Sequence, residues 1–362
     1  MIKYIGSKRA LAPEIERLAR RLPIRSAADL FAGTTRVGQA FRRAGCRVVS
    51  NDLATYSEAL GQAYIAAGDG LDRGRLRELL GRLGSLAGRP GYVARTFCAE
   101  ARFFSPENGA RIDAIRDAID EIDAPEPLRG SLLTSLLEAA DRVDSTCGLQ
   151  MAYLKRPAPR SRRPLELREP APVPGPPGEV TRRDANALAG ELEGVDCAYL
   201  DPPYNGHSYF SNYHVWETIV RWDRPDAYGV ARKRADCRTT RSDYNSSRRA
   251  WAALVDLVES LPTPWIVVSV SDEGFHDPAD VAELLAGRGH VASLAIDFPR
   301  YVGSRIGIHN PAGERVGAVS HVRNLEHLIV SGPDRAVVER AFDAPGHTRG
   351  GRALSAPGTR RR

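Results

Sequence analysis

Short apolar runs rich in β-branched residues alternate with helical patterns along this chain, and few folds are compatible with that order. The helical patterns span residues 10–21, 37–44 and 251–261. Alternating strands and helices predict an α/β fold with a doubly wound, mainly parallel sheet. The last two apolar runs are joined by a long segment without a helical pattern, so we expect them to pair antiparallel at the sheet edge. The runs predicted as strands are 27–31, 47–50, 195–200, 265–271, 291–298 and 326–330.

The alternation stops after residue 67, and the chain between there and the third strand has a different character. Residues 68–155 carry apolar residues at helical spacing and predict an inserted helical lobe. Residues 156–178 are crowded with Pro and Arg, which predicts a linker or extended arm because Pro lacks a backbone donor. The sheet domain then comprises residues 1–67 and 179–335. A Gly- and Arg-rich basic tail at 345–362 is expected to be disordered.

Composition excludes several classes of protein. No apolar run approaches the roughly 20 residues of a membrane span, and the N-terminus lacks the pattern of a secretory signal, so we expect a cytoplasmic protein. The five cysteines form no CxxC pair and the histidines have no ligand spacing, so neither a disulfide framework nor a metal site is predicted. A net charge of +6 permits a polyanionic partner such as nucleic acid.

The turn after the first predicted strand has the composition of a ligand site. It reads Asp-Leu-Phe-Ala-Gly at residues 29–33 and leads into a helix. Small residues at such a turn let a ligand approach the backbone at the carboxyl end of the sheet. The turn lacks the dinucleotide GxGxxG pattern, and Phe31 followed by Gly33 suits S-adenosylmethionine better than a pyrophosphate. The alternative is a strand-to-helix turn that binds nothing.

Asp52 lies at the end of the second predicted strand, about twenty residues after Gly33. An acidic side chain at this place in a nucleotide-binding sheet accepts hydrogen bonds from ribose hydroxyls. Asp is also a good helix N-cap, which is the alternative role for this residue. Its position relative to Gly33 favours the ribose ligand.

The most informative motif follows the third predicted strand and reads Asp-Pro-Pro-Tyr at Asp201, Pro202, Pro203 and Tyr204. Two consecutive prolines fix the turn, so the Asp201 carboxylate and the Pro202 carbonyl present two acceptors together. Both hydrogens of an exocyclic base amine can bond to these acceptors, which exposes the nitrogen lone pair to a sulfonium methyl group. Tyr204 offers a stacking face for a base flipped out of a duplex. The alternative is a Pro-rich loop after a buried strand.

In this order of motifs the chain resembles the Dam-like family of adenine-specific DNA methyltransferases over most of residues 1–330. The resemblance implies a seven-stranded methyltransferase sheet with a reversed final strand, S-adenosylmethionine as cofactor, and an inserted lobe that recognises duplex DNA. Asp52 and Asp201 match the family's acidic cofactor contacts. The segment Lys-Tyr-Ile-Gly-Ser-Lys is similar to the family's N-terminal motif and adds Tyr4 and Lys8 to the cofactor site, although Tyr stands where Trp is common. Asp184 matches a contact to the cofactor adenine, but the usual neighbouring aromatic is missing.

Two downstream segments, 209–217 and 301–310, are similar to blocks in type II restriction-system members of this family. Aromatic and polar residues beside the catalytic turn suit a flipped base and its backbone. The alternative is ordinary helix packing, and Trp216 is expected in the core. The resemblance also implies a monomeric enzyme that acts beside a cognate restriction endonuclease. Within the inserted lobe, Arg95, Arg102, Arg111 and Arg116 as a group are candidates for phosphate contacts, although a solvated helix face is the favoured interpretation of each one singly. The predicted DNA-proximal residues are Asn205, Tyr209, Tyr213 and His214.

Other substrates remain compatible with these motifs. The amine could belong to cytosine, to an RNA adenine or to a protein glutamine, and the acidic first position of the tetrapeptide together with the motif order favours DNA adenine. A non-catalytic DNA-binding protein on the same scaffold is a further alternative, which the intact tetrapeptide disfavours. Methylation at a ring carbon requires a thiol, typically after proline, and the chain contains no Pro-Cys dipeptide.

Overall fold

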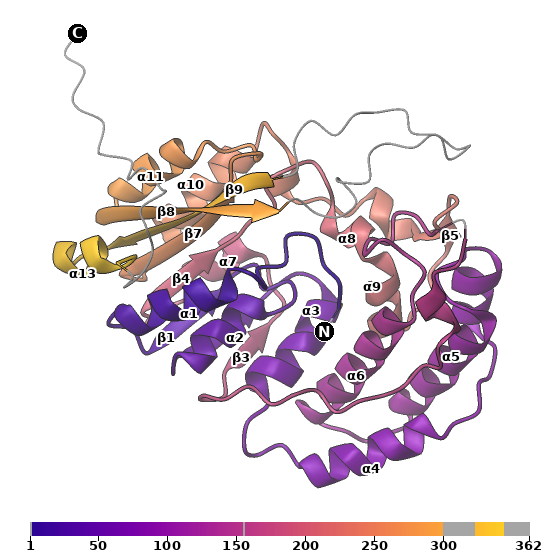
Figure 1. The fold of residues 1–362 in the computed structure, drawn as a ribbon. Coiled ribbons are helices and arrows are strands. Elements are labelled where there is room, and N and C mark those ends of the chain that lie inside the picture. The colour runs from indigo at the N-terminus through magenta and orange to yellow at the C-terminus, as the bar shows by residue number, and fades with distance from the viewer. Residues whose placement is uncertain (1, 155, 300–322, 344–362) are drawn as a thin grey trace.

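The computed structural model describes residues 2–154, 156–299 and 323–343, arranged as a sheet domain beside a helical lobe (Figure 1). The sheet has seven strands in the order β3-β2-β1-β4-β7-β9-β8. This agrees with the predicted α/β fold and its seven-stranded sheet. The strands are β1 (Ser26–Asp29), β2 (Arg47–Asn51), β3 (Glu179–Thr181), β4 (Cys197–Leu200), β7 (Trp265–Ser271), β8 (His290–Pro299) and β9 (Arg323–Gly332).

Strand direction follows the expected pattern. Strands β3, β2, β1, β4 and β7 are mutually parallel, and β9 runs antiparallel to both β7 and β8. The antiparallel pairing predicted for the last two strands is therefore confirmed. The reversed strand itself is β9, which lies between β7 and the edge strand β8. The short strand β3 was not predicted, because three residues after a Pro-rich segment form no recognisable apolar run.

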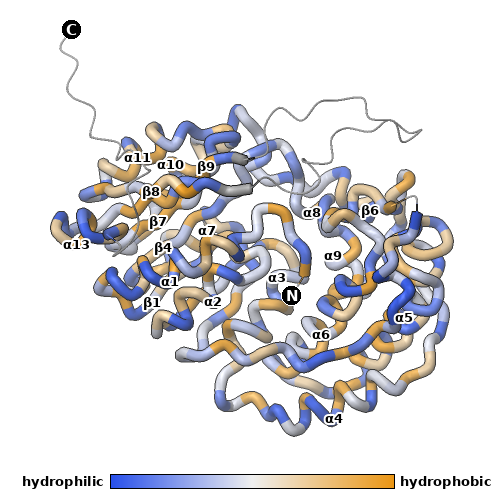
Figure 2. The backbone as a smooth tube through the Cα atoms, in the orientation of Figure 1, coloured by the Kyte–Doolittle hydropathy of each residue, from blue (hydrophilic) through white to orange (hydrophobic). Residues whose placement is uncertain are grey.

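Helices cover both faces of the sheet, which explains why the central strands are continuously apolar. Successive residues of β4 alternate between two cores: Cys197 and Tyr199 belong to one, Ala198 and Leu200 to the other. The tube in Figure 2 is mostly orange through these central strands. Helices α1 (Ala12–Arg21), α2 (Arg36–Arg43) and α13 (Arg335–Arg340) contribute to the first core, and α7 (Ala185–Ala189), α10 (Ala250–Ser260) and α11 (Pro278–Ala286) to the second.

The helical lobe is built from two separate parts of the chain. Its core joins apolar residues between Ala54 and Val143 to others between Tyr213 and Ala231. The predicted lobe at 68–155 supplies most of it, and the second part enters because one face of α9 is buried there, including Trp216 as expected. The lobe contains α3 (Thr55–Gly61), η1 (Gln62–Ala66), α4 (Arg73–Gly84), η2 (Ala94–Ala99), α5 (Pro106–Asp120), α6 (Leu128–Arg142), α8 (Tyr209–Asn212), α9 (His214–Arg221) and the hairpin of β5 (Ala227–Tyr228) with β6 (Lys233–Arg234).

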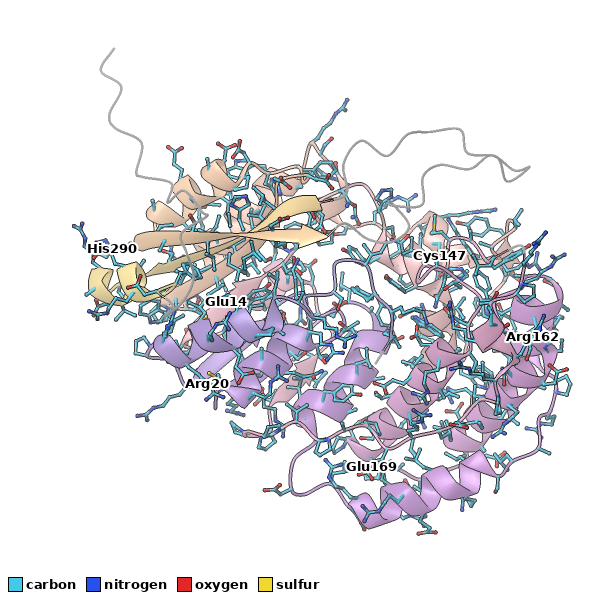
Figure 3. All side chains as sticks on the ribbon, in the orientation of Figure 1. Glu14, Arg20, Cys147, Arg162, Glu169 and His290 are labelled. Carbon is cyan, nitrogen blue, oxygen red and sulfur yellow. The ribbon has the colours of Figure 1, made fainter. Side chains whose placement is uncertain are left out.

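Residues 156–178 form an extended arm along the lobe, with one short turn of 3-10 helix, η3 (Pro159–Arg162). Leu165 is buried in the lobe core, and the Asn108 side chain donates to two carbonyls of the arm. Glu169, labelled in Figure 3, accepts a hydrogen bond from Arg73 at the start of α4 (2.8 Å). The arm is thus fastened to the lobe before it enters β3. The predicted basic tail at 345–362 and the family-like segment 301–310 lie outside the described residues.

Across the described ranges, the longest apolar helical stretch falls short of what a membrane crossing requires.

Candidate active site

A cavity of about 310 Å³ opens at the carboxyl ends of the parallel strands. Its wall includes Gly33 after β1, Asp52 after β2, Asp184 after β3 and Asp201 after β4. These residues are far apart in the sequence, and the sheet brings them together because parallel strands end at the same edge. Four further predicted residues also line the cavity: Tyr4, Phe31, Pro203 and Tyr209.

Asp52 fixes the glycine turn at one side of this cavity. Its carboxylate accepts hydrogen bonds from the backbone N–H of Gly33 (2.8 Å) and of Ala54 (2.9 Å). Burial raises the pKa of Asp52, and these N–H groups oppose the shift. Gly33 has φ +49°, and a Cβ there would lie 3.1 Å from the ring of Tyr4. Only glycine therefore leaves the cavity open at this point.

The end of the cavity at Phe31 is aromatic. Phe31 meets the edge of Tyr244 with ring centroids 5.1 Å apart, and the Tyr244 hydroxyl donates to the side chain of Asn186 (2.7 Å). Asp184 lines the same end while its carboxylate caps α7 through the N–H groups of Asn186 and Ala187. Tyr244 was not predicted. It supplies the aromatic ring that the sequence lacks beside Asp184, from a turn about sixty residues later in the chain.

The Asp-Pro-Pro-Tyr turn is held from two neighbouring loops. The Tyr204 carbonyl accepts from the N–H of Phe275 (2.9 Å), and the side chain of Asn245 donates to the carbonyl of Asn205 (2.9 Å). Pro202 is buried, whereas Pro203 faces the cavity. The turn is therefore hydrogen-bonded to both neighbouring loops, in addition to the restraint that its two prolines impose.

Lys8 lies behind Asp201 and is absent from the cavity wall. Its ammonium pairs with Oδ1 of Asp201 (2.9 Å) and with Oε1 of Glu326 (2.6 Å), and all three side chains are largely buried. Burial raises the pKa of Asp201 to about 6; Lys8 lowers it and Glu326 raises it further. Burial disfavours the charge of Lys8, but the two carboxylates outweigh that effect and raise its pKa well above the usual value. Lys8, predicted to contact the cofactor, therefore contacts the carboxylate of Asp201 and does not line the cavity.

Tyrosines form the wall between the sheet and the lobe. Tyr4 stacks on Tyr209 (centroids 5.4 Å apart) and on Tyr213 (4.4 Å), and its hydroxyl lies 3.3 Å from that of Tyr56. The Tyr213 hydroxyl accepts from the N–H of Ile5 (2.5 Å). This stack ties the N-terminal segment to the start of α9.

Two of the predicted DNA-proximal residues need correction. Tyr213 and His214 have no exposed surface, because α9 buries them in the lobe core, so we reassign both to packing. One ring nitrogen of His214 bonds to the carbonyl of Gln150, and burial lowers the pKa of this histidine to about 3. Tyr209 lines the cavity, and half-buried Asn205 accepts from the N–H of His207 within the turn.

The lobe arginines divide into structural and exposed ones. Arg116 is buried and donates to the carbonyl of Ile219 (2.7 Å), so its prediction as a phosphate contact is wrong. Arg111 donates to the carbonyl of Gly84 (2.7 Å). Arg95 is exposed beside a hollow of about 740 Å³ in the lobe surface. The same hollow is lined by Tyr92, Asp117, Trp222 and Arg224.

Comparison with known proteins gives consistent matches. The family model described as D12 class N6 adenine-specific DNA methyltransferase matches residues 4–256. Type II methyltransferase M.NlaIII of Neisseria lactamica is 33% identical, covering 83% of this chain and 92% of the relative. Modification methylase StsI of Streptococcus sanguinis is 30% identical over 78% of this chain, which spans only 46% of that longer protein. Type II methyltransferase M.CviAII of Paramecium bursaria Chlorella virus 1 is 28% identical, over 83% of this chain and 92% of the relative.

Proposed function

This chain belongs to the D12 class of N6 adenine-specific DNA methyltransferases, and from that premise we propose that it methylates the 6-amino group of a specific adenine in duplex DNA, using S-adenosylmethionine. The observation that carries the proposal is the shared cavity: the Asp-Pro-Pro-Tyr turn opens on the same space as Gly33 and Asp52. Methyl donor and acceptor amine would therefore meet in one place.

The cavity has the chemistry that this cofactor requires. Its volume lies at the lower end of the roughly 300–1,000 Å³ typical of ligand sites. Asp52 would accept hydrogen bonds from the ribose, and the Phe31 and Tyr244 rings would bound the adenine. Leu53 exposes 57% of its surface at the cavity wall, an apolar area that a bound nucleoside would cover. When bound, the cofactor supplies an electrophilic methyl group on sulfur.

Asp201 and Pro202 prepare the target amine. Oδ1 of Asp201 is paired with Lys8, which leaves Oδ2 as the acceptor for one amine hydrogen, while the Pro202 carbonyl would accept the other. Both hydrogen bonds strengthen as the nitrogen becomes tetrahedral and gains positive charge, so they stabilise the transition state more than the ground state. The methylated nitrogen must lose one proton, and the Asp201 carboxylate, which would already hold one of the amine hydrogens, would accept it.

The test is a transfer assay with methyl-labelled S-adenosylmethionine on duplex DNA, RNA and protein in parallel, followed by nucleoside analysis. Label in DNA as N6-methyladenine supports the proposal. Label as N4-methylcytosine, or only in RNA or protein, overturns it. Mapping the methylated positions in the genome of an expression host would then identify the target sequence.

The target base must leave the duplex to reach this turn, because a stacked base cannot enter a cavity at the strand ends. Flipping a paired adenine costs a few kcal/mol, and a mispaired adenine avoids part of that cost. A duplex with a mismatch opposite the target adenine is therefore expected to bind about tenfold more tightly than the matched duplex. Fluorescence anisotropy checks this, with a mismatch outside the target sequence as control. Equal affinities for all three duplexes would contradict flipping.

We also propose that the helical lobe recognises DNA. Support comes from the residues around the hollow of about 740 Å³ in its surface. The guanidinium of Arg95 lies over Tyr92 and that of Arg224 over Trp222, both 5.5 Å from the ring centroid. The Asp117 carboxylate accepts hydrogen bonds from Arg224 and from Arg89. Arg89 does not line the hollow itself. Trp222 and Arg224 both have positive φ, a strained backbone that non-glycine residues keep mainly at functional sites. Exposed arginines on aromatic rings suit phosphates and bases.

Replacing Arg89, Arg95 and Arg224 together by Gln is expected to weaken DNA binding and to flatten its salt dependence. Each lost phosphate contact lowers the slope of log K against log salt by roughly one unit. The matched control removes the same charge from α1 and α13, on the far side of the sheet domain (Figures 1 and 3), by changing Arg17, Arg20 and Arg335 to Gln. Equal slopes for the two triple variants would place the DNA surface elsewhere.

The named relatives are type II methyltransferases and modification methylases. Their names support the proposal that this chain protects its target sequence from a cognate restriction endonuclease. We further propose that it acts as a monomer, which light scattering of the purified chain would test.

A further inference from the structure

Glu326 is a buried carboxylate that the proposed reaction does not yet use. It lies on β9, paired with Ser271 of β7, outside the residues 4–256 that match the family model. Only 5% of its surface is exposed, and it does not line the cavity. A buried charge is costly unless it is paired, so its partners indicate what it does.

Those partners lead directly to the catalytic turn. Oε1 of Glu326 accepts hydrogen bonds from Lys8 Nζ (2.6 Å) and from the Ser269 hydroxyl (2.6 Å). The same Lys8 ammonium lies 2.9 Å from Oδ1 of Asp201. One ammonium therefore serves two carboxylates, and the cluster of Lys8, Asp201 and Glu326 has a net charge of −1 when both acids are ionised.

We propose that Glu326 is a positioning residue that acts through Lys8 to set the orientation and the charge of Asp201. The inference rests on the proposed function, because Asp201 is the group that it serves. If Lys8 paired with Asp201 alone, its positive charge would act entirely on the carboxylate whose other oxygen, Oδ2, must accept the amine hydrogen bond. Because Lys8 is shared with Glu326, it neutralises less of the negative charge of Asp201. Asp201 therefore presents more negative charge to the amine of the substrate. Ser269 holds Glu326, and Glu326 in turn holds Lys8 beside Oδ1 of Asp201, which leaves Oδ2 for the substrate.

Several other titratable groups act on Asp201 and define what a pH experiment measures. Burial raises the pKa of Tyr204 to about 12 and those of Tyr199 and Tyr209 well above the usual value, so these tyrosines stay neutral. Burial also raises the pKa of Asp29, to about 8. His327, next to Glu326 in the strand, faces the opposite side of the sheet, and burial lowers its pKa.

The test is the pH dependence of single-turnover methyl transfer to DNA by the whole protein, at saturating cofactor and DNA. Asp201 must be ionised to accept the amine, so the wild-type rate should fall as the pH drops through about 6. Glu326→Gln keeps the size of the side chain but removes its negative charge, which lowers the pKa of Asp201. The acidic midpoint is therefore expected to move down by about one pH unit, with a several-fold lower plateau rate.

Two further variants keep the inference falsifiable. Ser269→Ala removes the hydroxyl that donates to Glu326 but keeps the charge of Glu326. It should therefore lower the plateau rate, with a smaller shift of the acidic midpoint than Glu326→Gln causes. Glu193→Gln removes an exposed charge just before β4, at the amino ends of the parallel strands and away from the cavity, and should leave the profile unchanged. A Glu326→Gln midpoint equal to that of wild type, whatever the rate or the melting temperature, overturns the inference. Failure of the proposed function would appear differently, as a wild-type protein that does not methylate DNA at any pH.

Discussion

Replacing Asp201 by Asn is expected to lower the rate of methyl transfer by about 10²–10³-fold while the protein still binds cofactor and DNA. The amide has nearly the same shape but loses the negative charge that the amine nitrogen needs as it becomes positive. The Asn side chain also places its NH₂ group, a hydrogen-bond donor, against either Lys8 or the substrate amine, and both of these need an acceptor. The measurement is the single-turnover rate, with cofactor and DNA affinities determined on the same preparation.

The two affinities serve as the internal control for this variant. Because the proposed role of Asp201 is exerted mainly in the transition state, the dissociation constants should change far less than the rate. A rate within about tenfold of wild type would remove Asp201 from the reaction, and a parallel loss of cofactor affinity would assign it to binding instead.

Asp52→Ala is expected to have the opposite signature, raising the dissociation constant of S-adenosylmethionine by about 10–100-fold. Hydrogen bonds to a charged group contribute roughly 1.5–3 kcal/mol each, and this carboxylate would bond the ribose. The same change also removes the acceptor of the Gly33 N–H, which frees the turn that shapes the cavity. Isothermal calorimetry with S-adenosylhomocysteine measures the effect without turnover.

The matched control is Asp334→Ala, which removes the N-cap of α13 on the far side of the sheet domain. Both substitutions delete an acidic side chain that accepts a backbone N–H, so a difference between them isolates the cavity. If Asp52→Ala binds the cofactor as tightly as Asp334→Ala does, Asp52 is only a structural clamp.

The sequence predicted the sheet well because burial on both faces leaves a strong local signal. Strands β4 and β7 are continuous apolar runs between helical patterns, and both were found close to their observed bounds. Strand β3 escaped because it holds only three residues and owes its pairing to β2, a contact that no local pattern encodes. The cavity residues that end strands, such as Gly33, Asp52 and Asp201, were predictable for the same reason.

Residues that reach the site from outside the strand ends were not predictable. Tyr244 and Glu326 lie far from any motif in the sequence, and only the folded sheet brings them to Phe31 and Lys8. His214 was assigned to DNA because it stands among aromatic and polar residues near the catalytic turn. Its burial depends on the helices of the lobe that pack around α9, and sequence spacing within α9 carries no information about them.

The way the lobe is assembled has a consequence for how specificity can change. Its hydrophobic core draws on the inserted segment and on α9, and α9 begins only ten residues after Tyr204. A lobe from another enzyme therefore cannot be transplanted as one contiguous cassette: a chimera carrying residues 68–155 alone would leave Val215, Trp216 and Ile219 against a foreign surface. With the proposed role of the lobe in DNA recognition, new target sequences would arise by point substitutions within the existing lobe, or by exchange of both segments together.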